Sequence, residues 1–398
     1  MNILVINAGS SSIKYQLIDM NTELPLSSGI VERIGLEMGV IKHKTFTSGA
    51  EEKTIEEFPI PDHGVGLKRV SELLMDADKG VISDPSEIKA VGHRLVHGGE
   101  TFTQTVVITD EVKAKVKELF PLAPLHNPAN LIGVEVAEKV FPNATQVGVF
   151  DTAFHQSIPE KAFRYALPEK FYSELRIRKY GFHGTSHKFI SEKAIEYLGN
   201  PDAKIITIHL GNGASMAAVK GGVCVDTTMG MGPLSGLIMG TRSGDIDPAI
   251  IFYLAQQKGY SVEEISDLLN KESGMKGLTG LTDMRDVEKR QREGAPDAVL
   301  ALEMYAYRVK HFVGSYAAAM NGVDAIVFTA GIGENDTSIR RMVCEDMDYL
   351  GITWDEEKDK NRTDSLHEIN TAGAKTKVLI IPTNEELEIA KQSLELVK

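Results

Sequence analysis

Residues 7–12, Asn-Ala-Gly-Ser-Ser-Ser, combine a glycine with three hydroxyl groups close to the N-terminus, and Lys14 follows two positions later. Backbone N–H groups, hydroxyls and an ammonium are the components from which proteins build anion-binding loops. The chemistry that they suggest is the binding of a phosphate or another small anion. The same residue types are common in ordinary hairpin turns, and this alternative stays open for the segment taken alone.

Arginine and histidine side chains recur on glycine- or proline-rich segments further along the chain. Arg94 lies in HRLVHGG and Arg242 in GTRSGD, where neighbouring glycines allow the backbone to approach a ligand closely. His126, His183 and His209 have similar surroundings. A guanidinium binds carboxylate or phosphate through two parallel hydrogen bonds, so these residues are candidates for stabilising an anionic group in transfer.

Each of these candidates has an ordinary alternative. The chain has 43 Lys and Arg residues, and most of them are expected to be solvated surface charge. A histidine is more often a packed or capping residue than a catalytic one, and we interpret His97, His155 and His187 in that way. His183 is favoured as functional because it lies in a glycine-containing loop, GFHGTSH.

The elements that must position these residues repeat along the chain. Residues 2–19 predict a strand, a tight turn and a second strand, and the same pattern returns at 204–226 with HLGNGAS as the turn. A third apolar strand and glycine loop, DAIVFTAGIGEN, spans 324–335. Neither hairpin has the GxxxxGK[ST] spacing of a Walker A loop. The repetition predicts an internal duplication, with two α/β domains and a ligand site in the cleft between them.

Several other segments predict helices and connections. Helical spacing covers 64–78 and 110–120, whereas PLAPLHNPAN, residues 121–130, predicts a proline-rich loop before a helix at 131–141. A long helical run at 298–320 fits either a buried core helix or a subunit contact. Residues 377–397 predict a strand, a short loop and a helix that is capped by Thr383 or Asn384.

Length and composition limit the classes of protein to which this chain can belong. A chain of 398 residues with 42% hydrophobic and 25% charged residues is typical of a globular protein of two or three domains. The net charge of −13 argues against a general nucleic-acid surface, although a small anion can still bind in a locally positive cleft. We find no apolar run of ~18–20 residues and no signal peptide. The two cysteines form no motif, which favours a cytoplasmic location.

The motifs, taken in order, resemble those of the acetate kinase family, a branch of the actin/sugar-kinase/Hsp70 ATPase superfamily. The strings that carry the resemblance are INAGSSSIK, GHRLVHGGE, PLAPLHNP, VFDTAFH, YGFHGTSH, IHLGNGASMAAVKGG, MGTRSGDIDP, FTAGIGEN and IPTNEE. The resemblance implies an α/β fold of two duplicated RNase H-like domains, each with a mixed sheet flanked by helices. The first would comprise 1–150 with 386–398, and the second 151–385, with the adenosine site and a dimer interface.

The resemblance also implies an activity. The family transfers the γ-phosphate of ATP reversibly to acetate, which gives acetyl phosphate and ADP, with Mg²⁺ or alternatively Mn²⁺ as the metal. It implies a cytoplasmic homodimer that acts on small molecules, with no nucleic-acid or membrane partner. A propionate or other short-chain carboxylate kinase is the nearest alternative. An actin- or Hsp70-like ATPase switch is a second alternative, of a different class.

Roles for individual residues follow from the resemblance. It assigns Arg94 to the carboxylate of the substrate, and Arg242 and His183 to stabilisation of the transferring group. Asp151 is usually counted as catalytic in the family. Acetate is already deprotonated at neutral pH, so we expect Asp151 to act through metal, water or orientation and not as an obligatory base.

The remaining site residues are also implied by the resemblance. Those matching the apolar pocket for the acetate methyl group are Val96, Leu125, Phe182 and Pro233. Those matching nucleotide contacts are Ser10, Ser12, Lys14, His209, Leu210, Gly211, Asn212, Gly213, Asp283, Met284, Arg285, Gly331, Ile332, Gly333, Glu334 and Asn335. Those matching the magnesium positions are Asn7 and Glu385, of which Glu385 could equally be an ordinary acid at a helix N-terminus. Asp283 and Arg285 could equally form a surface ion pair.

Overall fold

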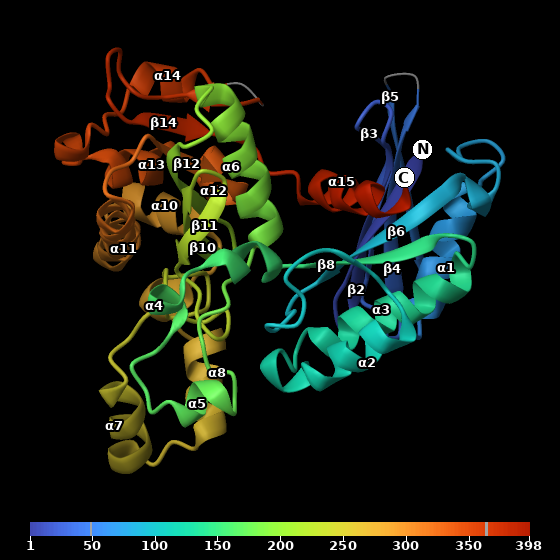
Figure 1. The fold of residues 1–398 in the computed structure, drawn as a ribbon, viewed down its shortest axis with the longest axis horizontal. Coiled ribbons are helices and arrows are strands. Elements are labelled where there is room, and N and C mark those ends of the chain that lie inside the picture. The colour runs from blue at the N-terminus through green and yellow to red at the C-terminus, as the bar shows by residue number, and fades with distance from the viewer. Residues whose placement is uncertain (48–49, 363–364) are drawn as a thin grey trace. The chain divides into compact units, whose positions relative to one another are not determined.

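The computed structural model describes residues 1–47, 50–362 and 365–398, which form two compact units (Figure 1). Unit 1 comprises Met1–Ala153 with Asn384–Lys398, and unit 2 comprises Phe154–Thr383. Each unit is built on its own β-sheet with helices packed against it. No helix within the described ranges is both long enough and apolar enough to cross a membrane.

The sheet of unit 1 has the strand order β5-β4-β3-β2-β1-β6-β8-β7. Its first five strands form an antiparallel meander, and β1, β6 and β8 run parallel. The strands are β1 Asn2–Ala8, β2 Ser12–Asp19, β3 Leu24–Glu32, β4 Gly39–Thr47, β5 Ala50–Phe58, β6 Ile88–Leu95, β7 Val106–Val107 and β8 Thr145–Phe150. The helices are α1 His63–Leu74, α2 Asp110–Glu118, α3 Asn127–Val140 and α15 Glu385–Val397.

Apolar side chains of β1 connect the sheet of unit 1 to its helices. Leu4 and Ile6 are fully buried in one core cluster with Leu67 of α1. The helix α15 packs on β1, β6 and β8, and it approaches so closely that a Cβ atom at Gly92 would lie 2.7 Å from Ile389. Burial of these apolar surfaces stabilises the unit by ~25 cal/mol per Å². The ends of β1, β6 and β8 are therefore held rigidly beside the first turn of α15.

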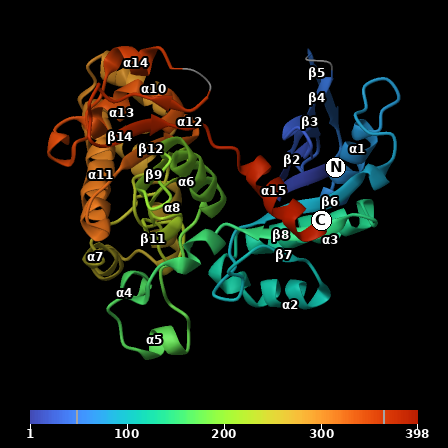
Figure 2. The same ribbon diagram turned by 45° about the horizontal axis from the view of Figure 1, so that its top comes forward.

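The sheet of unit 2 has the order β11-β10-β9-β12-β14-β13. Its strands are β9 Lys204–Leu210, β10 Ala214–Lys220, β11 Val223–Thr227, β12 Ala325–Thr329, β13 His367–Glu368 and β14 Lys377–Ile380. Its helices are α4 Glu160–Phe163, α5 Lys170–Ser173, α6 Gly184–Leu198, α7 Ala249–Lys258, α8 Val262–Lys271, α9 Gly274–Thr279, α10 Met284–Arg292, α11 Pro296–Met320, α12 Ala330–Asn335, α13 Thr337–Cys344 and α14 Glu356–Lys360. The helices α6 and α11 both pack on the central strands, and they lie on opposite sides of them (Figure 2).

The two sheets share one topology. In unit 1 the order β3-β2-β1-β6-β8 has β1, β6 and β8 parallel, and in unit 2 the order β11-β10-β9-β12-β14 has β9, β12 and β14 parallel. Each sheet ends in a two-residue strand, β7 or β13, paired antiparallel to its neighbour. The opening hairpins also match, since each has a three-residue loop, Gly9–Ser11 or Gly211–Gly213. The predicted α/β fold with two duplicated, mixed sheets is confirmed.

Local boundaries differ from the sequence prediction in two places. The helix α3 begins at Asn127, inside the predicted loop 121–130, because Pro128 fits the first turn of a helix. The apolar strand predicted at the start of 324–335 is β12, but the glycine loop predicted after it is instead the short helix α12. The last helix is capped as predicted by one of the two candidates, Asn384, whose side chain accepts from the Leu387 N–H at 2.9 Å.

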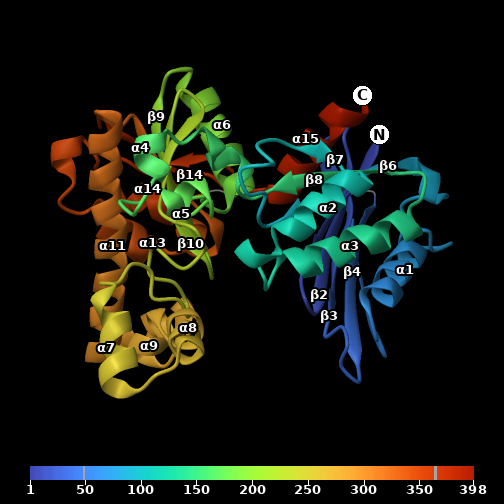
Figure 3. The same ribbon diagram turned by 60° about the horizontal axis from the view of Figure 1, so that its bottom comes forward.

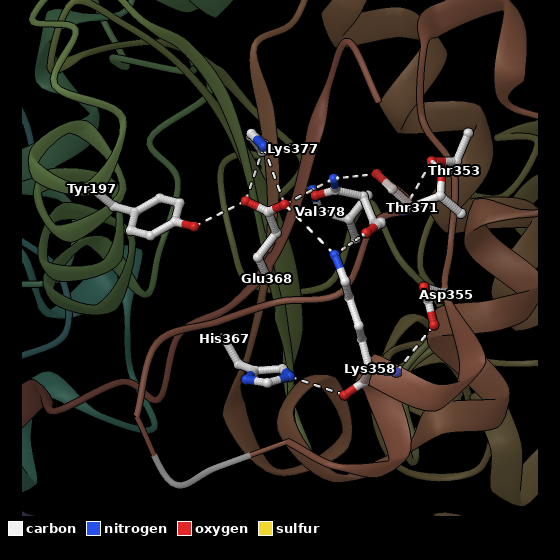
Figure 4. A network of polar contacts seen from close by, with 10 residues as sticks. Tyr197, Thr353, Asp355, Lys358, His367, Glu368, Thr371, Lys377 and Val378 are labelled. Carbon is white, nitrogen blue, oxygen red and sulfur yellow. Dashed lines mark hydrogen bonds and ion pairs between the residues drawn. The ribbon is translucent and has the colours of Figure 1, made fainter. Parts of the chain in front are cut away.

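A polar network fixes the outer edge of the unit 2 sheet (Figure 4). The Glu368 carboxylate of β13 accepts from the Tyr197 hydroxyl of α6 at 2.9 Å and pairs with Lys377 of β14 at 3.0 Å. Lys358 of α14 donates to the Asn370 carbonyl oxygen at 2.8 Å. Although burial opposes ionisation of Glu368, the hydrogen bonds from Lys377 and Tyr197 hold the pKa of this carboxyl below its usual value. These contacts tie together elements that are distant in sequence.

Candidate active site

Three predicted site residues meet at one edge of the unit 1 sheet, which Figure 3 shows with α3 in front of its strands. Asn7 is the penultimate residue of β1, Arg94 is the penultimate residue of β6, and Asp151 directly follows β8. The carboxyl ends of neighbouring parallel strands lie together, so the topology itself assembles the three side chains. Glu385, at the start of α15, lies beside them, with its Oε2 atom 3.8 Å from Arg94 Nε.

Arg94 and Asp151 form a two-point ion pair. Arg94 donates from Nε to Asp151 Oδ1 at 3.0 Å and from Nη2 to Asp151 Oδ2 at 2.6 Å. Asp151 is 2% exposed. Burial lowers the pKa of Arg94, but the carboxylates of Asp151 and Glu385 outweigh it and raise this pKa further above its usual value. The guanidinium is therefore permanently charged and held in one orientation, as recognition of a carboxylate ligand requires.

Glu385 is a carboxyl group in an unfavourable electrostatic position. Burial raises its pKa, and the charges of Asp151 and Glu386 raise it further, while Arg94 and Lys14 lower it. A buried group of like charges favours the binding of a cation. Among the described residues no three His, Cys, Asp or Glu side chains gather as a metal site. Mg²⁺ commonly binds through one or two protein oxygens plus phosphates and waters, so the oxygen donors of Asn7 and Glu385 fit this ion.

Two asparagines of α3, absent from the sequence prediction, hold the backbone that follows Arg94. Asn130 accepts from the Val96 N–H at 3.0 Å and donates to the Ala8 carbonyl oxygen at 2.7 Å. Asn127 accepts from the His97 N–H at 3.1 Å and donates to its carbonyl oxygen at 3.0 Å. Both side chains therefore position the loop beside Arg94. The string NPAN, an early helix turn rich in amides, was the signal that could have indicated them.

The four residues predicted for the acetate methyl group are divided between the units. Val96 is half-buried in unit 1, whereas Leu125 is 75% exposed there. In unit 2, Phe182 is buried and Pro233 is half-buried. Leu125 is therefore not buried within unit 1, and its assignment to an apolar pocket stays a prediction.

The loop of the first hairpin is anchored through the backbone of Gly9, whereas side chains beside it are exposed. The Gly9 N–H donates to the Ser12 carbonyl oxygen at 2.8 Å, and His63 Nε2 contacts the Gly9 carbonyl oxygen at 2.7 Å. Ser10 and Lys14 are exposed, and Ser12 is half-buried. Lys14 lies directly opposite Asn7 in the β1–β2 register. The predicted phosphate-binding groups therefore lie next to the predicted metal ligand.

In unit 2, Arg242 is a half-buried cation that makes no ion pair with a described residue. Its Nη1 donates to the Pro233 carbonyl oxygen at 3.0 Å and lies 3.8 Å from Met239 Sδ. Burial lowers the pKa of Arg242 below its usual value. A guanidinium that has been taken partly out of water without a counter-charge is costly unless an anionic ligand supplies that charge. Arg242 is thus the strongest anion-binding candidate in unit 2.

His183 lies on the same side of the second hairpin loop as Arg242. A Cβ atom at Gly213 would meet His183 Nε2 at 3.3 Å and Arg242 Nη1 at 4.0 Å, so this glycine leaves room for both groups. The His183 ring stacks on that of His209, with centroids 4.4 Å apart. His183 has a φ of +57° at the N-terminus of α6. Such a conformation in a non-glycine residue costs free energy and is concentrated at functional sites.

A chain of buried hydrogen bonds holds the His183 ring. Burial lowers the pKa of His187 well below its usual value. His187 Nδ1 lies 2.7 Å from the Thr207 hydroxyl, and its Nε2 lies 2.8 Å from the Ser215 hydroxyl. Ser215 in turn lies 2.8 Å from His183 Nδ1. These contacts fix the orientation of the His183 ring.

This hydrogen-bond chain was missed by the sequence prediction, which interpreted His187 as an ordinary packed residue. His187 is indeed fully buried, but its two nitrogens connect Thr207 to the ring of His183. Its position four residues after His183, in the first turn of the helix that follows, was the available signal.

A cavity of about 540 Å³ gathers the predicted nucleotide-binding residues of unit 2. Predicted residues that line it are Gly211, Asn212, Asp283, Met284, Arg285, Gly331, Ile332 and Asn335. Lining residues that the sequence did not indicate are Gly240, Met275, Thr282, Glu288, Tyr305 and Asp336. Predicted residues outside the lining are His209, Leu210, Gly213, Gly333 and Glu334. Asp283 and Arg285 satisfy both interpretations, since they line the cavity and also form an exposed ion pair.

The helix α12, which forms one wall of the cavity, is shaped by Glu334. Its Oε1 atom accepts from the backbone N–H groups of Ala330 at 2.8 Å and Thr383 at 3.2 Å. These bonds hold the left-handed turn at Ala330, where φ is +64°. Glu334 thus contributes to the cavity by folding the segment after β12.

Two duplicated α/β units, with candidate anion-binding groups at the ends of their central strands and a nucleotide-sized cavity, fit the class of nucleotide-dependent phosphotransferases and ATPases. The family model described as the Acetokinase family matches residues 2–391, and the chain belongs to this family. It is 56% identical over 398 residues to the acetate kinase of Flavobacterium johnsoniae, with complete coverage of both chains.

Two solved structures are similar over nearly the complete chain. The crystal structure of Porphyromonas gingivalis acetate kinase has a TM-score of 0.95, 46% identity and 100% coverage of both chains. That of a propionate kinase from Francisella tularensis has a TM-score of 0.92, 40% identity and 99% coverage of both chains. The fold is therefore shared by enzymes named for different short-chain carboxylates.

Proposed function

We propose that this protein is an ATP:acetate phosphotransferase, which converts acetate and ATP reversibly into acetyl phosphate and ADP. The observation that carries the proposal is the full-length similarity to relatives named acetate kinase. The site residues support it, because the chain carries two arginines suited to two different anions. Arg94 is fixed and fully charged, and Arg242 lacks a protein counter-charge among the described residues.

In this proposal Arg94 binds the carboxylate of acetate. Asp151 accepts hydrogen bonds from Nε and Nη2 of the guanidinium, and Nη1 forms no hydrogen bond with a described residue. The cavity of unit 2 binds the adenosine of ATP, and the loops Gly9–Ser11 and Gly211–Gly213 bind its phosphates through backbone N–H groups. An acetate oxygen attacks the γ-phosphorus while the bond from that phosphorus to the β,γ-bridging oxygen breaks, and ADP leaves with the electron pair.

Charge stabilisation, not proton removal, is the main task of the site. Negative charge spreads over the transferring phosphoryl oxygens, and Arg242 and His183 would stabilise it from fixed positions. Attack by acetate releases no proton, so Asp151 has no base function to perform in this direction. Its two hydrogen bonds with Arg94 support a role in orienting that guanidinium. The finer assignment of Asp151 to orientation is part of the proposal.

We propose that Mg²⁺ is held by Asn7 and Glu385. The ion would neutralise phosphate charge, and Mn²⁺ would substitute for it because it prefers the same oxygen ligands. A Glu385→Gln variant is expected to raise the Mg²⁺ concentration for half-maximal activity about 10- to 100-fold, with little loss of thermal stability. Glu395→Gln, which changes an exposed acid of the same helix, is the matched control. Equal Mg²⁺ dependence in the Glu385 variant and the wild type would remove Glu385 from the metal site.

We propose that the protein is a cytoplasmic homodimer with α7 at the interface. This helix, AIIFYLAQQK, is largely apolar and yet has no buried residue in the single chain. Phe252 is 61% and Tyr253 55% exposed. Large contiguous apolar surfaces of this kind mark protein interfaces. Light scattering should give twice the mass of one chain, and Phe252→Glu should reduce it to one; a wild-type monomer would contradict the proposal.

The competing functions are separated by one experiment. kcat/KM is measured with ATP for formate, acetate, propionate and butyrate, and the acyl phosphate is trapped as its hydroxamate. Acetate should be the best substrate, and each added methylene should lower kcat/KM about 10- to 200-fold. A preference for propionate would favour the second candidate, which the similarity to the Francisella enzyme supports. ATP hydrolysis without any carboxylate would favour an ATPase switch.

A further inference from the structure

The ring of His209, the penultimate residue of β9, is held beside the Gly211–Gly213 loop by a ring stack and a hydroxyl group. It stacks on the His183 ring, with centroids 4.4 Å apart. Its Nδ1 atom lies 2.8 Å from the Ser186 hydroxyl oxygen. A Cβ atom at Gly211 would meet His209 Nε2 at 3.7 Å, so the second ring nitrogen faces the loop. The Ser186 contact therefore sets which edge of the ring lies toward the loop.

The Ser186 hydroxyl has a second partner on a segment that is distant in sequence. Thr383 Oγ1 lies 2.9 Å from Ser186 Oγ, and the two residues are 197 positions apart. Ser186 is fully buried and lies in the first turn of α6. A serine hydroxyl has one proton and two lone pairs, so the contacts with Thr383 and His209 use most of its hydrogen-bonding capacity. The three side chains form a continuous polar chain within unit 2.

The backbone around Thr383 is fixed at the end of the unit 2 sheet. The Thr383 N–H donates to Glu334 Oε1 at 3.2 Å. Two residues earlier, the Ile381 carbonyl oxygen accepts from the Thr329 hydroxyl at 2.6 Å. Thr383 is also the last residue of unit 2, from which the chain passes into unit 1. The Thr383 hydroxyl therefore starts the polar chain from a fixed point.

The polar chain differs from ordinary pairing of buried hydroxyls in where it ends. Buried hydroxyls need partners in every fold, and most side-chain hydrogen bonds are made to backbone groups or water. This chain instead joins two hydroxyls to a nitrogen of an imidazole ring, and the ring faces a glycine loop on its other edge. Its geometry is that of a support for the His209 ring.

We propose that Ser186 and Thr383 are positioning residues for the binding of the terminal phosphates. Thr383 fixes the Ser186 hydroxyl, which holds the His209 ring with Nε2 toward the hairpin loop. The inference rests on the proposed function, which places phosphates at this loop and the transferring group at His183, on which His209 stacks. A group held in its bound orientation loses less freedom when the ligand arrives. A flipped ring presents Cε1 in place of Nε2 and loses the contact.

The test is calorimetric titration of the full chain with ADP and with AMP in the presence of Mg²⁺. Thr383→Val replaces the hydroxyl with a methyl group and should weaken ADP binding about 3- to 10-fold, the usual effect of one lost hydrogen bond. AMP lacks the terminal phosphate, so its affinity should stay the same. Thr383→Ser keeps the hydroxyl and should keep the wild-type ratio of the two affinities. A purely structural role of Thr383 would change both affinities together.

The matched control is Thr371→Val, which breaks another hydroxyl pair of unit 2, with Thr353 at 2.7 Å, and should leave the ratio of the affinities unchanged. Ser186→Ala removes both contacts and should lower ADP affinity at least as much as Thr383→Val; it also tests the chain if that variant does not fold. An unchanged ratio in both variants, or an equal loss for ADP and AMP, would overturn the inference. Absence of acyl phosphate in a wild type that binds ADP would instead refute the proposed function, and the binding test would still apply.

Discussion

Replacing Arg242 with glutamine is expected to lower kcat about 10²- to 10³-fold, the usual effect of removing one fixed charge or donor from a transition state. Its effect on stability should be small or favourable. Arg242 is half-buried without a carboxylate partner among the described residues, and in the free protein it makes a single short hydrogen bond, to the Pro233 carbonyl oxygen. Loss of that bond costs ~1 kcal/mol, and removal of an unpaired buried charge offsets it.

The measurements are single-turnover kinetics and thermal unfolding of the same preparations. Arg341→Gln is a suitable control, because Arg341 is a surface arginine of unit 2 that pairs with Glu345 one helical turn away. It should change neither activity nor melting temperature. Arg242→Lys should recover part of the lost activity, since it restores the charge but not the planar fork. An Arg242→Gln enzyme that melts well below the wild type would show that this arginine serves the fold instead of a ligand.

The parts of the fold that the sequence predicted correctly are those in which the local residue pattern and the tertiary structure favour the same element. The largely apolar runs at 3–6 and 205–208 lie in central strands, and the glycine-containing turns after them close hairpins as expected. The segment 330–335 differs, because its glycines favour a loop and the carboxylate of Glu334 folds it into a helix through a bond to Thr383, about fifty residues away. A contact at that sequence separation leaves no periodic pattern from which it could be predicted.

The residues of the candidate site also divide into those that the sequence indicated and those that it did not. The sequence indicated the arginines and the glycine loops, because these residue types are unusual in their surroundings. Glu288 was not visible, since an acid in the helix MRDVEKRQR resembles any solvated helix residue. It lines one cavity with Asp336, which lies at the junction of α12 and α13 and is distant from it in sequence. His187 was similarly hidden, because burial alone does not distinguish a packed histidine from one that orients a neighbour.

Asp359→Asn is expected to destabilise the protein by ~3–5 kcal/mol, the usual cost of leaving one partner of a buried ion pair uncompensated. The side chains of Arg340 and Asp359 are both fully buried. Asp359 accepts from Arg340 Nε at 3.0 Å and from the Trp354 indole N–H at 2.8 Å. Arg340 Nη1 in turn donates to the Gly333 carbonyl oxygen in α12 at 2.8 Å. The pair therefore supports the cavity wall as well as the core of unit 2.

These two roles can be separated by thermal unfolding and nucleotide binding in matched variants. Asp359→Asn should lower the melting temperature of unit 2 and weaken ADP binding together. The double variant Arg340→Met/Asp359→Leu removes both charges, so it should recover most of the stability. It cannot restore the bond to Gly333, and its ADP affinity should stay reduced about 3- to 10-fold. Glu356→Gln, on the exposed face of α14, should change neither quantity. Full recovery of ADP affinity in the double variant would show that α12 keeps its shape without Arg340, and that the buried pair serves stability alone.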